Sequence, residues 1–447
     1  MSSVSVGLFG LFLLFLLMVF RMPVAFAMVI AGMAGITILN SWSAAVSTLY
    51  TEIWGTLTYV ELTVIPLFVL MGNIAGASGM SRDLYNAAYA WTGHFRGGLA
   101  HATILGCTGF AALSGSSVAS ALTLGRVALP EMKRFGYDPR LAAGSVAAGG
   151  TLGILIPPST GFIVYAILTE ESIGRLFLAG IVPGLLLSAF FMAVISILTL
   201  FKREIGPAGR RFSLRERLVY LARGTSILMI IFASIGGIYG GVFTPVEAAA
   251  VGATLAFLFA LPRTAFSRAS LADAVLKTVS TTVMIYFIII GASVFSPFLA
   301  LTQIPAALAA GLAVLDLHPV ALLALVLAVF VFLGTFLDGF AMMVLVLPIV
   351  LPIIQQSRIR EVFGILTESD LKIWFGVIMV IVLEMALISP PVGMNVFVVK
   401  SVSDVPMKDI YAGIMPFWLA MLICLAVIAA FPELSLYLPG TMRGPGS

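Results

Sequence analysis

Two pairs of consecutive prolines lie inside apolar stretches of this chain and limit what it can fold into. The first is in TLGILIPPSTGFIVYA (Thr151–Ala166), and the second is in ISPPVGMNVFV (Ile388–Val398). Proline lacks the backbone donor of a helix and clashes with the preceding turn, so each pair must interrupt a helix. Pro390 follows Pro157 by 233 residues, and the AGI triplets after the two pairs keep the same spacing. The chain therefore contains an internal repeat with a broken helix in each copy.

The residues around both breaks are those of a membrane protein. Of the 447 residues, 61% are hydrophobic and 10% are charged, whereas about a quarter of a soluble domain is charged. The formal net charge of +4 therefore reflects loop topology rather than nucleic-acid binding. Cys107 and Cys424 lie in apolar stretches and predict neither a disulfide framework nor a metal site. The composition thus predicts an all-α polytopic protein in a lipid bilayer.

Basic loops orient the predicted spans. The segment Lys202–Arg223 holds seven Lys or Arg residues against Glu204 and Glu216, which makes it cytoplasmic by the positive-inside rule. The loop 358–372 has no net charge, which suits the opposite side. No basic residue precedes the first apolar run, so we expect a retained span instead of a signal peptide, and periplasmic termini. The predicted spans are 4–20, 22–40, 57–77, 141–168, 176–200, 218–241, 245–262, 279–299, 373–399 and 410–432.

Two further apolar segments have both flanks on one side and are predicted to be re-entrant helical hairpins. They are 99–128, with its tip at Ser114–Ser117, and 318–355, with its tip at Gly334–Gly339. Each arm would reach roughly half to two-thirds of the way through the hydrocarbon core. Each half then has five spans, one of them broken, and one hairpin, in opposite orientation. This pattern is an inverted-topology repeat.

The breaks place helix ends at membrane depth. A helix that ends there leaves free carbonyls, which suit a cation, and one that begins there leaves free N–H groups, which suit a carboxylate. Pairing the first tip with Ile156–Gly161 predicts one oxygen-rich site, and pairing the second tip with Ser389–Asn395 predicts its symmetry mate. Asp338 is the acid at a tip and a functional candidate. Glu384 fits a coupling residue and a hydrogen-bonded structural acid equally well.

Two motifs are interpreted as structural. Thr244, Pro245 and Glu247 form a capping box with proline at the first helical position, so Glu247 is expected to start a helix. Gly236, Gly237, Gly240 and Gly241 form overlapping GxxxG pairs, a pattern typical of close helix packing.

The segment LSGSSVASALTLGRVALPEMKRFGYDPRLAAGSVAAGGTLGILIPPS (Leu113–Ser159) and the second break resemble a known family. Over residues 1–435 the chain is similar to the large membrane subunit (M subunit, DctM-like) of tripartite ATP-independent periplasmic (TRAP) transporters. The resemblance implies an elevator-type fold of the ion-transporter superfamily. It implies Na⁺-coupled import of an organic acid, such as a C4-dicarboxylate or sialic acid, with Na⁺ as coupling ion and no other cofactor. The implied partners are a separate small Q subunit (DctQ-like) and a periplasmic substrate-binding P subunit, at the bacterial inner membrane.

The resemblance also divides the chain and assigns residues. The implied parts are a scaffold at 1–97 and 218–316, a transport part at 98–201 and 317–435, a cytoplasmic loop at 202–217, and a tail at 436–447 whose ending RGPGS resembles the remnant of an engineered tag. One Na⁺ site is implied at Ser114, Gly115, Ser117, Gly150, Pro157 and Ser159. The other is implied at Gly334, Thr335, Asp338, Pro390, Gly393 and Met394. The implied substrate-binding residues are Ser116, Thr160 and Asn395.

Three other functions compete with this one. A channel needs a continuous pore, whereas inverted repeats with paired breaks at membrane depth suit alternating access. A carrier of the same superfamily that works without Q or P fits the residues equally, and only the resemblance argues against it. Gly76–Gly79 has the GxSG form of rhomboid-type intramembrane serine proteases, whose chemistry needs a facing histidine base. His101 and His318 lie at hairpin edges, and neither HExxH nor GxxxxGK[ST] occurs. We therefore expect a transporter and not an enzyme.

Overall fold

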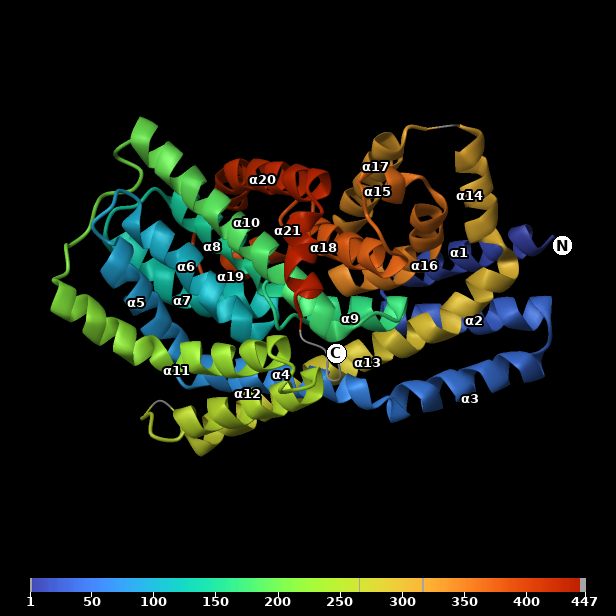
Figure 1. The fold of residues 1–447 in the computed structure, drawn as a ribbon, viewed down its shortest axis with the longest axis horizontal. Helices are drawn as coiled ribbons and strands as arrows, with labels where there is room; N and C mark the ends of the chain where they lie inside the picture. Colours follow the sequence, from blue (N-terminus) through green and yellow to red (C-terminus); the bar gives the residue numbers. More distant parts are fainter. Residues whose placement is uncertain (1, 265, 316, 443–447) are drawn as a thin grey trace. The chain divides into compact units, whose positions relative to one another are not determined.

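The computed structural model describes residues 2–264, 266–315 and 317–442, which form helices, turns and loops (Figure 1). The chain divides into two compact units. Unit one comprises residues 1–63, 280–333 and 337–372, and unit two comprises 64–279, 334–336 and 373–447.

Unit one combines the beginning of the first repeat with the second hairpin and the helices on either side of it. Its elements are α1 (Ser3–Val19), α2 (Val24–Leu39), α3 (Trp42–Thr58), the 3-10 turn η1 (Val60–Thr63), the second half of α13 (Arg268–Thr302), α14 (Ile304–Val314), α15 (Pro319–Gly334), α16 (Gly339–Gln356) and α17 (Ile359–Val362). Glycines on α1 and α2 face Phe298 of α13, where an added Cβ at Gly10 or Gly35 would clash with the ring. Small residues therefore let these helices pack closely.

Unit two holds the first hairpin and both broken helices. Its elements are α4 (Val64–Ala77), α5 (Met80–Thr92), α6 (Gly98–Ser114), α7 (Ser117–Arg134), α8 (Pro139–Leu155), α9 (Thr160–Thr169), α10 (Ile173–Phe201), α11 (Leu214–Tyr239), α12 (Pro245–Ala260), the first part of α13, α18 (Glu368–Leu387), α19 (Met394–Ser401), α20 (Met407–Ala430) and α21 (Glu433–Gly440). The hairpin is α6–α7, and the broken helices are α8–α9 and α18–α19.

Helix α8 is central to unit two. It contacts α6, α7, α10 and α20, and 83% of the residues in the most apolar 18-residue stretch of Pro139–Thr169 are buried, against 22% in that of α11. Its small residues allow this, because a Cβ at Gly144 would collide with the backbone of Gly413 on α20. The first break therefore lies in the most enclosed helix pair of the unit.

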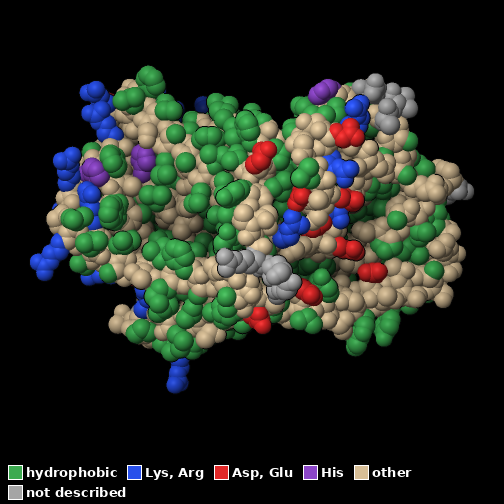
Figure 2. Space-filling model, in the orientation of Figure 1, with side chains coloured by type: hydrophobic (Ala, Val, Ile, Leu, Met, Phe, Trp, Pro, Cys, Tyr) green, Lys and Arg blue, Asp and Glu red, His purple; other side chains and the backbone are tan. Residues whose placement is uncertain are grey.

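Seven helical segments within the described residues are long and apolar enough to cross a membrane: Val60–Ala77, Pro139–Thr169, Ile173–Phe201, Leu214–Tyr239, Arg268–Thr302, Gly339–Gln356 and Met407–Ala430. The predicted spans at α1, α2 and α12 are apolar helices of 16 or 17 residues. Lys and Arg side chains gather at the end of unit two that carries α5 and the α10–α11 connection (Figure 2). This distribution agrees with the basic loops used to orient the chain.

Five helices lie outside the predicted spans and hairpins, among them the short α17 in the predicted loop 358–372. Helix α3 alternates apolar residues with serine and threonine, so it does not stand out as a span. The helices α5 and α14 precede the two hairpins, and α21 follows the last span. Amphipathic helix α5 carries Arg82 and Asp83 and has no apolar run of span length. Short or partly polar helices thus lack the span-length apolar signal on which the predicted spans rest.

The GxxxG interpretation was wrong for α11. A Cβ at Gly236 would meet nothing within 4 Å, and Gly237 faces Phe243 of the following turn. The helix ends at Tyr239, and Gly241 adopts φ +70°, which glycine tolerates best. Gly240 and Gly241 therefore follow the end of the helix, and neither Gly236 nor Gly237 faces another helix within the described residues.

The capping box at α12 is confirmed. The Thr244 hydroxyl accepts from the Glu247 backbone N–H at 3.3 Å, and the Glu247 carboxylate accepts from the Thr244 backbone N–H at 2.8 Å. Thr244→Ala should lower the free energy of unfolding by about 1 kcal/mol because it removes a helix cap. Glu247→Gln should leave stability and uptake unchanged, since glutamine also completes a capping box. Thermal unfolding in detergent measures the first, and a loss of uptake in Glu247→Gln would contradict the structural role.

Candidate functional site

The first hairpin turns on three residues. Helix α6 ends at Ser114, Gly115 adopts φ +57° as its cap, and Ser116 is extended and caps α7 with its hydroxyl, which accepts from the Ala119 N–H at 3.4 Å. The hydroxyls of Ser114 and Ser120 are 2.8 Å apart. The tip is therefore a turn dense in hydroxyl and carbonyl oxygens, as predicted.

The first break is enclosed. Helix α8 ends at Leu155, and Ser159 caps α9 by accepting from the Phe162 N–H at 3.2 Å while its hydroxyl donates to the Ile154 carbonyl. The peptide bond between Pro157 and Pro158 is cis. All six residues from 156 to 161 are buried. Irregular backbone at this depth is tolerated because it is surrounded by protein.

The tip and the break are joined directly. The hydroxyl of Thr160 donates to the Gly115 carbonyl at 2.6 Å, and the Thr160 N–H points to the same oxygen at 3.3 Å. A Cβ added at Gly115 would lie 2.8 Å from the Pro158 carbonyl oxygen. The pairing of tip and loop expected from the sequence is thus present.

Glycines on neighbouring helices bring more backbone to the same place. A Cβ at Gly153 of α8 would lie 2.5 Å from the Ser116 carbonyl oxygen, and one at Gly150 would lie 3.2 Å from that of Ser117. A Cβ at Gly72 of α4 would lie 2.7 Å from the Leu113 carbonyl oxygen. The hairpin tip therefore has backbone against it from α4, α8 and the break.

Glu384 of α18 completes this cluster and is absent from the residues that the resemblance assigned. Its side chain is fully buried, and its Oε1 accepts a short hydrogen bond from the Ser117 hydroxyl. Its Oε2 has no hydrogen-bond partner in the described structure. An uncompensated buried carboxylate costs several kcal/mol, so this oxygen is poised for a cation or a donor. The sequence signal was an acid in an apolar stretch near the second break.

The second break differs from the first. Pro390, Pro391 and Val392 are exposed, and Gly393 adopts φ +56° ahead of α19. The Tyr411 hydroxyl lies 3.0 Å and 2.9 Å from the carbonyl oxygens of Pro391 and Val392. The two copies of one motif are therefore solvated differently.

Asn395 opens α19 and is fully buried. Neither its amide oxygen nor its amide nitrogen has a partner within the described structure. Helix α19 packs against α7 and α8, the helices that flank the first tip and break. A buried amide costs free energy unless it is hydrogen-bonded, so Asn395 is suited to a ligand that supplies both a donor and an acceptor.

The second predicted cation site is divided between the units. Asp338 belongs to unit one, where its carboxylate accepts from the Phe340 N–H at 3.2 Å and caps α16. Gly334 and Thr335 are buried and belong to unit two, as do Pro390, Gly393 and Met394. The assembly of these residues stays a prediction.

The residues of the protease alternative have other partners. Ser78 is buried and its hydroxyl donates to the Ala75 carbonyl at 3.1 Å. The ring nitrogens of His101 lie 2.9 Å from the Gly97 carbonyl and 3.0 Å from the Ser196 hydroxyl. Both side chains thus have ordinary structural roles.

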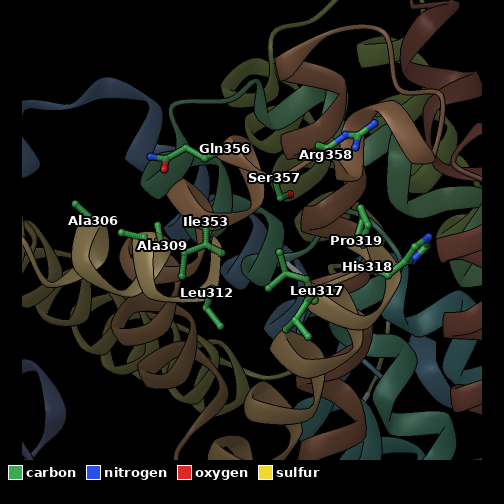
Figure 3. Close-up of a pocket in the computed structure, with 12 residues that line it drawn as sticks. Ala306, Ala309, Leu312, Leu317, His318, Pro319, Ile353, Gln356, Ser357 and Arg358 are labelled. Atoms are coloured by element: carbon green, nitrogen blue, oxygen red, sulfur yellow. The ribbon is translucent and has the colours of Figure 1, made fainter. Parts of the chain in front are cut away.

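A separate pocket in unit one contains none of the predicted site residues (Figure 3). It has a volume of about 620 Å³ and is lined by α14, the start of α15 and the end of α16. His318 and Arg358 lie on one side and Gln356 on the other. His318 accepts from the Val320 N–H at 3.3 Å, and Arg358 pairs with Glu361 at 3.1 Å. This pocket is distinct from the hairpin cluster.

Comparison with known proteins agrees with this architecture. A family model described as "Tripartite ATP-independent periplasmic transporter, DctM component" matches residues 11–434. The C4-dicarboxylate TRAP transporter large permease protein DctM of Pseudomonas aeruginosa is 39% identical over 91% of this chain and 93% of that protein. The sialic acid TRAP transporter large permease protein SiaM of Vibrio cholerae is 32% identical over 95% of this chain and 96% of that protein.

The structure of the YdaH transporter of Alcanivorax borkumensis is similar in fold. The two have a TM-score of 0.60 at 15% identity, over 86% of this chain and 88% of that one. At this identity the likeness concerns the fold alone. It confirms the predicted class, an all-helical polytopic membrane protein with repeated hairpins and broken helices.

Proposed function

This chain belongs to the DctM component family of tripartite ATP-independent periplasmic transporters, and from that membership we propose that it imports an organic acid by coupling to Na⁺. The chain is a transport protein and not an enzyme. The proposed location is the bacterial inner membrane, with both termini periplasmic. The proposed partners are a small Q subunit and a periplasmic substrate-binding P subunit.

The observation that carries Na⁺ coupling is the buried carboxylate at the first tip. Na⁺ is a hard cation that favours carboxylate, hydroxyl and carbonyl oxygens. Glu384 supplies one negative charge, and Ser117 holds it against the start of α7. We propose that Na⁺ binds beside this pair, with further oxygens from Ser114 and the backbone of Gly115. Gly150, Pro157 and Ser159 bring the surrounding backbone close enough to enclose the ion.

A second Na⁺ is proposed at the other tip and break. Its ligands would come from Gly334, Thr335 and Asp338 together with Pro390, Gly393 and Met394. Asp338 would provide the charge there, as Glu384 does at the first tip. Two charged sites suit a carrier that uses the downhill movement of Na⁺ to drive the import of a carboxylate.

The substrate is proposed to bind between the tips. Asn395 offers an unpaired amide, and the start of α9 at Thr160 offers a positive dipole end. Ser116 would contribute its hydroxyl from the tip. A carboxylate is the group shared by the compounds named for the two relatives above, a C4-dicarboxylate and sialic acid. We therefore propose an organic acid without choosing between them.

Movement is proposed to follow the elevator scheme. Residues 98–201 and 317–435 would carry the site across the membrane, while 1–97 and 218–316 stay fixed. The cytoplasmic loop 202–217 would connect the two repeats. Binding of each cation then favours binding of the substrate, so that Na⁺ and the organic acid cross together.

Uptake into proteoliposomes tests the proposal. With the Q subunit and a substrate-loaded P subunit present, uptake should require an inward Na⁺ gradient and should fall at least tenfold when choline replaces Na⁺, because the driving ion is missing. Proton and K⁺ gradients of equal size serve as controls. Uptake that persists without Na⁺ would overturn the coupling. Uptake of free organic acid without P would instead favour a carrier that works alone.

A further inference from the structure

A pocket of about 800 Å³ lies beside the first hairpin within unit two. Its walls come from α4, α5, α7, and the stretch from Pro262 to Lys277. At one end it reaches Gly72, whose neighbour is the tip backbone, and Ala119, which donates to the Ser116 hydroxyl. The pocket therefore runs from the hairpin tip toward the basic side of the unit.

The charges in this pocket do not balance. Arg263 pairs with Asp83 at 2.5 Å, and Lys277 pairs with Asp273 at 2.6 Å, so four of its charged groups neutralise one another. Arg82 and Arg126 also line the pocket and form no ion pair with any described carboxylate. Two guanidinium groups thus leave a net positive pocket.

The same two arginines line an adjoining pocket of about 540 Å³ with Tyr85, Tyr89 and Glu131, so this lining keeps one positive charge in excess. Arg82 comes from α5 and Arg126 from α7, two helices in contact with each other. Orientation in the membrane requires cations on the cytoplasmic side, but it does not require them to line hollows. Arg82 and Arg126 line both cavities, so an anionic ligand in either one could reach their guanidinium groups.

We propose that Arg82 and Arg126 form an anion subsite that receives the carboxylate of the substrate after it leaves the hairpin tip. A guanidinium group binds a carboxylate through two parallel hydrogen bonds. Because both arginines are exposed to water, the binding is weak, and a release pathway needs weak binding so that the ligand can leave. This subsite rests on the proposed function, since an organic acid is the ligand.

Arginine footprinting of the purified chain tests the subsite without transport. Phenylglyoxal modifies accessible arginines, and mass spectrometry follows each one separately, with succinate as the probe. Succinate should slow the modification of Arg82 and Arg126 at least threefold, and butane-1,4-diol should have no effect. Arg203, an exposed arginine of the cytoplasmic loop, is the matched control. Equal slowing at Arg203, or none at either proposed residue, overturns the subsite.

The variant Arg126→Gln tests whether Arg82 and Arg126 bind the same succinate molecule or are protected independently. Arg126→Gln should remove the protection of Arg82, because both groups hold one dianion, whereas Arg203→Gln should not. Protection that survives in Arg126→Gln overturns a joint subsite. In proteoliposomes, Arg82→Gln/Arg126→Gln should raise the half-saturating internal concentration for efflux severalfold and leave the external one unchanged. An unchanged internal value overturns the release role. A wild-type chain that carries no organic acid overturns the proposed function alone, because the footprint does not depend on transport.

Discussion

Glu384→Gln should lower Na⁺-driven uptake by about 100-fold at low Na⁺, equivalent to roughly 3 kcal/mol. Glutamine keeps the size of the side chain but removes the negative charge that faces the first hairpin tip. Its Oε1 can still accept from the Ser117 hydroxyl, so the packing of α18 against the tip should remain. The lost interaction is then the one between the free Oε2 and the cation.

The measurement is the initial uptake rate as a function of Na⁺ concentration. Glu384→Gln should shift the half-saturating Na⁺ concentration upward, whereas Glu384→Asp, which keeps the charge on a shorter side chain, should shift it less. Glu204→Gln makes the same chemical change in the exposed loop after α10, away from the tip and from the proposed anion subsite. Size-exclusion profiles establish that each variant folds. An unaltered Na⁺ dependence in Glu384→Gln would contradict Na⁺ binding by Glu384 and leave it a structural role.

Gly115→Ala should abolish at least nine-tenths of the uptake while the chain still inserts and folds. The residue has φ +57°, where an added Cβ costs roughly 1 kcal/mol. That Cβ would also lie 2.8 Å from the Pro158 carbonyl oxygen, so the tip must separate from the break. Separation would lengthen the hydrogen bond from the Thr160 hydroxyl to the Gly115 carbonyl.

Gly136→Ala is the control for the strain of the backbone alone. Gly136 has φ +71°, but its added Cβ would meet nothing within 4 Å. Both variants should lose a similar amount of stability through backbone strain, and only Gly115→Ala should lose transport. Thermal unfolding and uptake, measured on the same preparations, separate the two effects. Equal uptake in both variants would show that contact between tip and break is dispensable.

Much of the fold could be predicted because its main signals are local. Apolar length, proline pairs and loop charge located the hairpin α6–α7 and the break at 156–161 without any knowledge of contacts. The helices α3 and α5 were missed because their polar residues resemble loops when only span-length hydropathy is considered. Local sequence signals therefore predicted the long apolar segments better than the partly polar helices.

The site could be predicted only in part because its decisive contact is long-range. Ser117 and Glu384 are separated by 267 residues, and nothing in the sequence near either one names the other. The pairing of Gly115 with Thr160 was within reach because both lie at recognised irregularities. Glu384 lies inside a regular helix, where a single acid has several possible explanations. Packing in three dimensions decides among them.

The difference in solvation between the two breaks has a kinetic consequence. An ion at the first break must shed its water and wait for surrounding protein to open, because residues 156–161 are all buried. An ion at the second break meets exposed prolines and can exchange with water quickly. The two ions would then load at different rates, the ion at the second break sooner than the ion at the first. Two copies of one motif would thus bind their ions at different rates because one copy is buried and the other is exposed.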